Sequence, residues 1–141
     1  MKFSRALILA SSLAFFACDD STSADNGSGS ADCSVTDGVK VVSPKGGEEF
    51  KVGETIKVVF GSDMDFGGFG VELRFDEGAK KVNLLDESID DAKIDGKTCN
   101  EYSIKLDAEL GVVAADDAYI YVYPYSKQSK AGKSGTFKVK E

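Results

Sequence analysis

Residues 41–60, VVSPKGGEEFKVGETIKVVF, contain the clearest structural pattern of the chain. Near the end of this stretch Ile56, Val58 and Phe60 occupy every second position, with Thr55 and Lys57 between them. An alternation of period two places apolar side chains on one face of an extended strand and polar ones on the other. The preceding groups SPKGG and KVGE supply the proline and glycines that tight turns require. The stretch therefore predicts a half-buried β-strand that follows a turn.

The same alternation recurs along the rest of the chain. Strand patterns occur at residues 39–41, 56–60, 69–75, 82–84, 102–106, 119–123 and 137–139. Turn-forming groups such as DFGG, DEGAKK, DGKT and KQSKAGKSG separate them. Short strands at this spacing predict an all-β, antiparallel β-sandwich of about seven strands. Residues 106–115 are the one helical candidate, but Gly111 makes a loop or a single turn the better prediction.

The N-terminus has the features of an export signal. Residues 1–18 read MKFSRALILASSLAFFAC, in which Lys2 and Arg5 precede an apolar run. The run is about twelve residues long, short of the roughly twenty that a membrane-spanning helix needs. We therefore expect a signal peptide that is removed after export.

The end of this signal favours lipid attachment. An A-x-A cleavage site fails because Phe15 lies three positions before the cleavage point. Ala17-Cys18 resembles the lipobox of bacterial lipoproteins, in which the cysteine becomes the lipidated first residue, although Phe15 and Phe16 depart from the usual pattern. We predict a signal peptide at 1–17, lipidation of Cys18, and anchoring to a bacterial membrane at the cell envelope or surface. The alternative is an ordinary secreted protein with a free Cys18.

The predicted lipid attachment site leads into a tether and then one domain. Residues 18–32 contain Asp, Ser, Thr, Gly, Ala and Asn after the cysteine, which predicts a flexible acidic tether. Asp19 resembles an inner-membrane retention signal of some Gram-negative bacteria, and the choice of inner or outer membrane stays open. Residues 33–141 are long enough for one domain with its own core.

Two cysteines remain once Cys18 is assigned to lipid. Cys33 stands at the start of the predicted domain, and Cys99 precedes the strand pattern at residues 102–106. Outside the cytoplasm an even pair is more often joined than free. We therefore predict a Cys33–Cys99 disulfide, which contributes about 4 kcal/mol in the chain-entropy model.

A family resemblance adds to this interpretation. Pro44, Gly46 or Gly47, Phe50, Gly53 and the alternation ending at Phe60 resemble the first strand pair of the immunoglobulin-like domain in Ser-Thr-rich, GPI-anchored and yeast cell-wall-synthesis proteins. The family usually has Trp where this chain has Phe60. The segments VELRF and SGTFKV resemble its third and closing strands. The resemblance implies an immunoglobulin-like fold and a noncatalytic module associated with polysaccharide-rich walls.

The segment DDAYIYVYPYS contains the candidate ligand-binding residues. Its tyrosines are Tyr119, Tyr121, Tyr123 and Tyr125, which an extended strand places on one face at intervals of roughly 7 Å. In one register the alternating Ala118, Ile120 and Val122 point inward, and the tyrosines form an exposed stripe that can stack on sugar rings. In the other register the tyrosines belong to the core. The sequence leaves both registers open.

Composition excludes several other functions. The chain has no His, which removes the commonest triads and many metal sites, and its net charge of -7 argues against nucleic acid. Acidic groups suitable for calcium are Asp63 and Asp65, then Asp86, Glu87, Asp90 and Asp91, then Asp116 and Asp117. None follows an EF-hand pattern, so we expect solvated loop charges, no metal site, no cofactor and no enzyme activity.

Three functions from different classes remain. The first is a lipid-anchored module that binds carbohydrate or a cell-wall polymer through the tyrosine strand. The second is a protein–protein scaffold or an accessory module of a surface complex, with the tyrosines buried and an envelope protein as partner. The third is a small hydrolase, which is disfavoured because the acidic residues lie in polar, glycine-rich loops, where little burial raises the pKa of a general acid.

Overall fold

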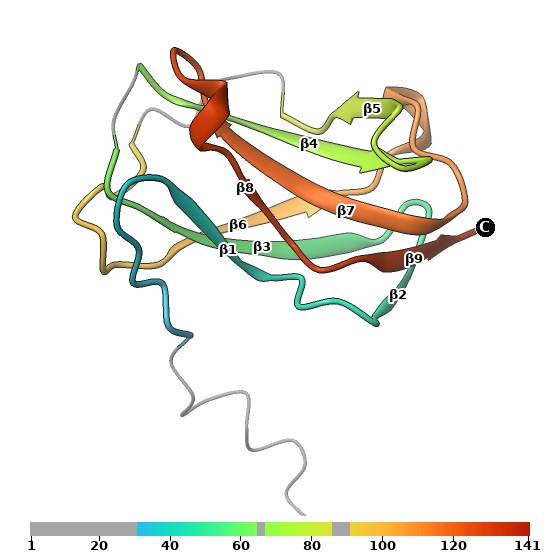
Figure 1. Cartoon of the computed structure of the whole chain (residues 1–141). Helices are drawn as coiled ribbons and strands as arrows, with labels where there is room; N and C mark the ends of the chain where they lie inside the picture. Colours follow the sequence, from blue (N-terminus) through green and yellow to red (C-terminus); the bar gives the residue numbers. More distant parts are fainter. Residues whose placement is uncertain (1–30, 65–66, 86–90) are drawn as a thin grey trace, which may run out of the picture. The chain divides into compact units, whose positions relative to one another are not determined.

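The alternating apolar residues form two facing sheets in the computed structural model, which describes residues 31–64, 67–85 and 91–141 (Figure 1). These residues belong to one compact unit, Ala31–Glu141. The predicted signal peptide at 1–17, Cys18 and most of the predicted tether at 18–32 lie outside the described residues. Within the described residues, no helix has the length and apolar character needed to cross a membrane.

The smaller sheet has three strands and the larger one six. The smaller sheet has the order β1 (Val39–Ser43), β3 (Thr55–Ser62), β6 (Asn100–Lys105). The larger sheet has the order β2 (Glu49–Lys51), β9 (Phe137–Lys140), β7 (Ala115–Pro124), β4 (Phe69–Phe75), β5 (Lys80–Asn83), and β8 (Gly132–Lys133) pairs with β7. Immunoglobulin-like sandwiches pack strands A, B and E against G, F, C and C′, and β1-β3-β6 against β9-β7-β4-β5 reproduces that order.

The strand prediction is confirmed for all seven patterns, but the described residues contain nine strands. The additional strands are β2 and β8, which have three and two residues and are too short to show a period. The pairing of β2 with β9 is parallel, whereas the other pairs are antiparallel. The segment at residues 106–115 contains one 3-10 turn, η1 (Ala108–Leu110), as expected, and η2 (Gln128–Lys130) is a second such turn.

The core lies between the two sheets. Phe60 of β3 and Phe69 of β4 are almost completely buried, and their ring centroids lie 5.6 Å apart. Phe50 of β2 packs edge-on against Phe137 of β9 at 5.2 Å. Burial of such aromatic surface is the main stabilising contribution to a sandwich of this size. In β3, β4 and β9 the inward residues are the alternating apolar ones that the period-two pattern predicts.

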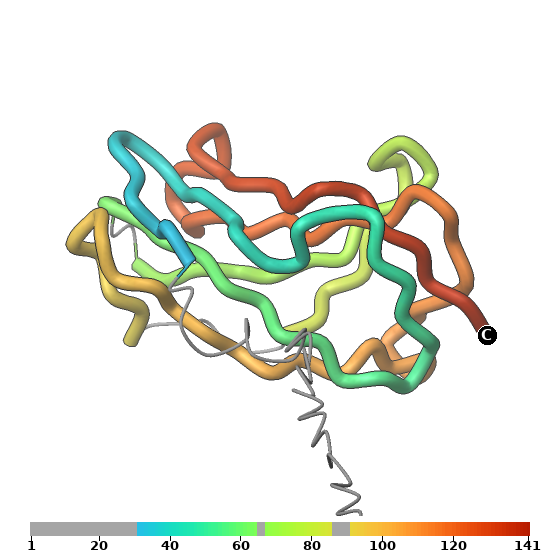
Figure 2. The backbone as a smooth tube through the Cα atoms, turned by 90° about the horizontal axis from the view of Figure 1, so that it is seen from below, coloured from blue at the N-terminus to red at the C-terminus, as the bar shows by residue number. Residues whose placement is uncertain are grey.

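The start of the unit crosses the outer face of the three-stranded sheet as a strap, which we define as residues 31–35. The predicted disulfide is present, and it joins Cys33 of the strap to Cys99 just before β6. The strap passes directly over Gly61 of β3, where a Cβ atom would lie 2.0 Å from the carbonyl oxygen of Cys33. In Figure 2 the strap and the turn before β6 lie toward the end of the unit that is opposite the C-terminus.

Candidate ligand-binding face

The register of β7 places its tyrosines on the outer face of the larger sheet. Ala118, Ile120 and Val122 are fully buried and point toward the opposite sheet. Tyr119, Tyr121 and Tyr123 alternate with them and are partly exposed. Of the two registers that the sequence allows, the structure has the one with an outward tyrosine stripe. Tyr125 follows β7 and is 41 % exposed.

The tyrosine rings form a continuous surface, which we call the tyrosine face. It consists of Tyr119, Tyr121, Tyr123 and Tyr125 with the outward residues of β4, β5 and β8 beside them. The ring centroids of Tyr121 and Tyr123 are 5.7 Å apart, and those of Tyr123 and Tyr125 are 5.9 Å apart. These separations lie in the range of favourable aromatic pairs. The rings therefore support one another along the strand.

Tyr123 lies against the backbone of β4. Its partner across the strand pair is Gly70, where a Cβ atom would lie 2.4 Å from the ring carbon that carries the hydroxyl. Only glycine leaves room for the ring at this position. Burial, followed by the nearby charge of Glu72, raises the pKa of the Tyr123 hydroxyl. The ring is held in place by β4 and keeps its proton at neutral pH.

Tyr121 is held by a cation and by a backbone group. The guanidinium carbon of Arg74 lies 3.6 Å from the centroid of the Tyr121 ring, which is a close cation–π contact. The Tyr121 hydroxyl donates a hydrogen bond to the carbonyl oxygen of Gln128, at 3.3 Å. Both contacts restrict the ring before any ligand arrives.

A buried carboxylate fixes the position of Arg74. Glu72 is 6 % exposed although it belongs to the outer face, and its Oε2 accepts from Arg74 Nε at 2.9 Å. Arg74 Nη2 lies 2.8 Å from the same oxygen, and Lys81 Nζ lies 3.5 Å from Oε1. Partial burial opposes the charged form of Arg74, but the hydrogen bond and charge of Glu72 outweigh it, so the pKa of Arg74 is raised. This pair makes the cation beside Tyr121 permanent.

Tyr119 borders a depression of about 410 Å³ at one end of the stripe. The lining residues are Glu77, Asp117, Tyr119, Lys133, Ser134 and Thr136. Lys133 Nζ lies 5.8 Å from the centroid of the Tyr119 ring, and a Cβ atom at Gly78 would lie 2.8 Å from the Tyr119 hydroxyl. The depression combines an aromatic ring with hydroxyl and charged groups, which is the usual composition of a polar ligand site.

Two of the acidic residues considered for calcium, Asp63 and Asp117, accept hydrogen bonds from the backbone of nearby turns. Asp63 accepts hydrogen bonds from the backbone N–H groups of Asp37 and Gly38, which lower the pKa of its carboxyl group. Asp117 accepts from those of Glu77 and Asp76, with the same effect on its pKa. Within residues 31–64, 67–85 and 91–141, no group of three metal-ligating side chains comes together. Asp65, Asp86, Glu87 and Asp90 lie outside the described residues.

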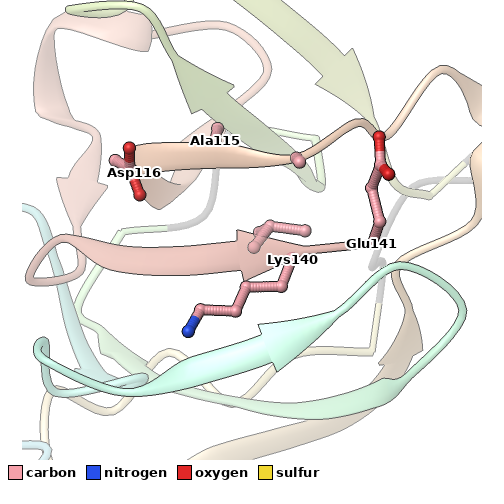
Figure 3. Close-up of a pocket in the computed structure, with 6 residues that line it drawn as sticks. Ala115, Asp116, Lys140 and Glu141 are labelled. Carbon is pink, nitrogen blue, oxygen red and sulfur yellow. The ribbon is translucent and has the colours of Figure 1, made fainter.

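A second depression lies at the irregular pairing between β7 and β9 (Figure 3). It has a volume of about 380 Å³ and is lined by Ala114, Ala115, Asp116, Val139, Lys140 and Glu141. None of these six lining residues, all of them described, has an aromatic ring. The depression therefore lacks the groups that would stack on a planar or ring-shaped ligand.

Comparisons with known proteins give no relative for this chain. No family model, no curated protein and no solved structure matches it. The assignment of the candidate site therefore depends only on the geometry described above.

The sequence analysis missed the residues that hold the tyrosines in place. These are Gly70, Glu72 and Arg74 on β4, Lys81 on β5 and Lys133 on β8. The alternation in VELRF places Glu72 and Arg74 on one face of their strand, and that was the available signal. Which residues of β7 they contact depends on the pairing register of two strands that are far apart in the chain.

Proposed function

We propose that this protein is a noncatalytic, exported lipoprotein of the bacterial envelope, anchored through Cys18, that binds a carbohydrate or cell-wall polymer on its tyrosine face. The observation that carries the proposal is a row of outward tyrosines whose rings are spaced 5.7 and 5.9 Å apart. Aromatic rings on a sheet surface offer apolar faces to sugar rings, and their hydroxyls supply hydrogen bonds at the rim.

The rigidity of the face supports a binding role. Gly70 makes room for Tyr123, the Glu72–Arg74 pair supports Tyr121, and Lys133 lies near Tyr119. A side chain that is already ordered loses little conformational entropy when a ligand binds, which improves affinity. Four tyrosines without such support would be expected to collapse onto the sheet or to vary in orientation.

The chemistry of the face supports binding over catalysis. Glu72 is its buried carboxylate, and it is held by Arg74 and Lys81. A general acid for glycoside hydrolysis needs a raised pKa and a second carboxylate across the scissile bond. Both carboxylate oxygens of Glu72 are engaged by the neighbouring cations, one by Arg74 and the other by Lys81, and this opposes the role of general acid.

A protein partner is the second candidate, and one observation favours it. Tyrosine and arginine are the side chains that most often dominate protein–protein interfaces, and Arg74 and Tyr121 stack at the centre of this face. A surface-complex module that uses the exposed tyrosines differs from the scaffold expected from the sequence, in which the tyrosines were buried.

The test is binding of the full chain, purified from membranes in mild detergent, to a panel of insoluble polysaccharides. Tyr121→Ala and Tyr123→Ala should each weaken binding about tenfold, because each removes a stacking ring. Tyr121→Phe, which keeps the ring but loses the hydroxyl bond to Gln128, should weaken binding less than Tyr121→Ala. Lys57→Ala, on the outer face of the other sheet, should bind like the wild type. If the intact protein retains no polysaccharide, the glycan proposal is wrong. In cells, Cys18→Ser should lose acyl labelling.

A further inference from the structure

We propose that the polymer bound by the tyrosine face is an acidic glycan, whose repeating units carry carboxylate or phosphate groups. This inference depends on the proposed function, since it specifies the chemical class of the glycan. It comes from the distribution of charge among the aromatic rings, which the proposed function does not use.

The register of three strand pairs places the cations among the tyrosines. Arg74 of β4 lies opposite Tyr119 on one side and opposite Lys81 of β5 on the other. In the next row Tyr121 lies between Glu72 of β4 and Lys133 of β8. Residues paired across strands point to the same face of a sheet. Two cations therefore flank the tyrosines from β4 and β5, and a third does so from β8.

The charges of this group do not cancel. Beside Tyr121, Arg74 and Lys81 share one carboxylate, Glu72, which leaves an excess of positive charge there. Lys133 flanks Tyr121 from β8, but it also lines the depression at Tyr119 together with Glu77 and Asp117. The Glu72 side chain is only 8 % exposed, whereas that of Lys81 is 65 % exposed, so a ligand meets the cations more readily than the anion. The whole chain has a net charge of -7. A local excess of cations favours ligand groups of negative charge by attraction at that point of the face.

The neighbouring acidic residues indicate where the negative groups of the ligand would lie. Asp117 and Glu77 border the depression at Tyr119, and Asp117 is hydrogen-bonded to the β4–β5 turn. Repulsion disfavours a ligand anion at that end. The ligand anions are expected beside Tyr121 on the Arg74–Lys81 side, with sugar rings on Tyr121 and Tyr123.

The experiment compares an acidic glycan with its neutral counterpart, using the full chain in mild detergent. The probes are polygalacturonate, the same polymer after methyl esterification, a phosphate-bearing wall teichoic acid, and polyglutamate as a polyanion without sugar. We expect the acidic glycans to bind at least about tenfold more tightly than the esterified polymer at low salt, with the difference lost near 1 M salt.

Variants locate the effect on the tyrosine face. Lys81→Gln combined with Lys133→Gln should weaken binding to polygalacturonate about tenfold and binding to the esterified polymer by a much smaller factor, so that the preference for the acidic polymer falls. Lys57→Gln combined with Lys105→Gln, which removes two exposed cations from the other sheet, is the matched control and should change neither.

The possible outcomes separate this inference from the proposed function. Equal binding of the acidic and esterified polymers would overturn the inference and leave a glycan-binding protein. Equally tight binding of polyglutamate would also overturn it, because the surface would then recognise charge without sugar. Retention of no glycan of either kind, acidic or neutral, would overturn the proposed function itself.

Discussion

Outside the strap, the outer face of the three-stranded sheet carries solvated side chains, whereas the outer face of the larger sheet carries a row of tyrosines that contact one another and residues of β4. On the smaller sheet Lys57 and Glu101 form an ion pair at 3.5 Å, and both side chains are more than half exposed. On the larger sheet Glu72 is buried beneath Arg74, and Arg74 stacks on Tyr121. Both outer faces follow from the same period-two alternation, but only that of the larger sheet has a row of aromatic rings in contact with one another.

The larger sheet has interactions on its outer face, chiefly the Glu72–Arg74 pair, that a β-sandwich does not need in order to fold. A sandwich needs apolar inner faces and tolerates almost any polar outer face, because exposed ion pairs contribute little to stability. A buried carboxylate is costly unless it is paired, and the Glu72–Arg74 pair meets that condition. The arrangement on the larger sheet is the one on which the proposed binding role depends.

The largest expected effect comes from replacing a glycine by alanine, and the same replacement can be made on each face. Gly61→Ala places a Cβ atom 2.0 Å from the Cys33 backbone, which cannot move because Cys33 is bonded to Cys99, so we expect a loss of about 3 kcal/mol. Gly70→Ala meets the far end of the Tyr123 side chain, which can swing away, so the loss should be about 1 kcal/mol or less. Urea unfolding of the full chain measures both.

The two glycine variants also separate an effect on stability from an effect on glycan binding. Gly70→Ala should displace Tyr123, change the near-UV circular dichroism of the tyrosines and weaken glycan binding. Ser103→Ala, at an exposed position on the smaller sheet, is the control and should change neither property. Equal losses of stability in Gly61→Ala and Gly70→Ala would contradict the difference that we draw between the two faces.

An intermediate effect comes from removing one carboxylate charge on each face. Glu72→Gln should destabilise the protein by about 2 kcal/mol, because it leaves Arg74 partly buried without its counter-ion. Glu101→Gln should change the free energy of unfolding by less than about 0.5 kcal/mol, since its pair with Lys57 is exposed. Thermal unfolding compares them, and a Glu72→Gln variant as stable as Glu101→Gln would show that the buried pair is not needed for folding.

The smallest expected effect is a pH dependence near the strap. The Thr98 hydroxyl, with the backbone N–H groups of Thr98 and Lys97, lowers the pKa of Asp95 to about 2. The unfolded value is about 3.9, so this stabilisation is present above about pH 4 and is lost as the pH falls through 2. Asp95→Asn should therefore be less stable than the wild type at neutral pH, with the difference shrinking between pH 4 and 2. A difference that stays constant with pH would argue against this role of the carboxylate.

Most of the fold was predictable because the inner faces of the strands differ clearly from the outer ones. Ile56, Val58 and Phe60 identify one phase of β3 without reference to any other strand. The disulfide was predictable because two cysteines remain once Cys18 is assigned to the predicted lipid attachment. The strands β2 and β8 were not predictable, since three and two residues cannot display a period and their pairing comes from β9 and β7.

The candidate site was predictable only in part. The tyrosines could be named from the sequence, but both phases of β7 are apolar enough to be buried, so the pattern did not choose between them. Phe60 and Phe69 already occupy the space between the sheets, and the smaller Ala118 and Ile120 belong to the same buried cluster. A buried tyrosine also needs a partner for its hydroxyl, and the core offers few.

The sequence by itself therefore determined the all-β sandwich, the disulfide partners and the residue types of the candidate site, because period-two alternation and cysteine number are local properties of the chain. The tertiary structure decided which side of β7 faces outward and which residues support the tyrosines. Those outcomes depend on the register between β4 and β7 and on the volume available in the core, and both are set by strands that are distant in sequence.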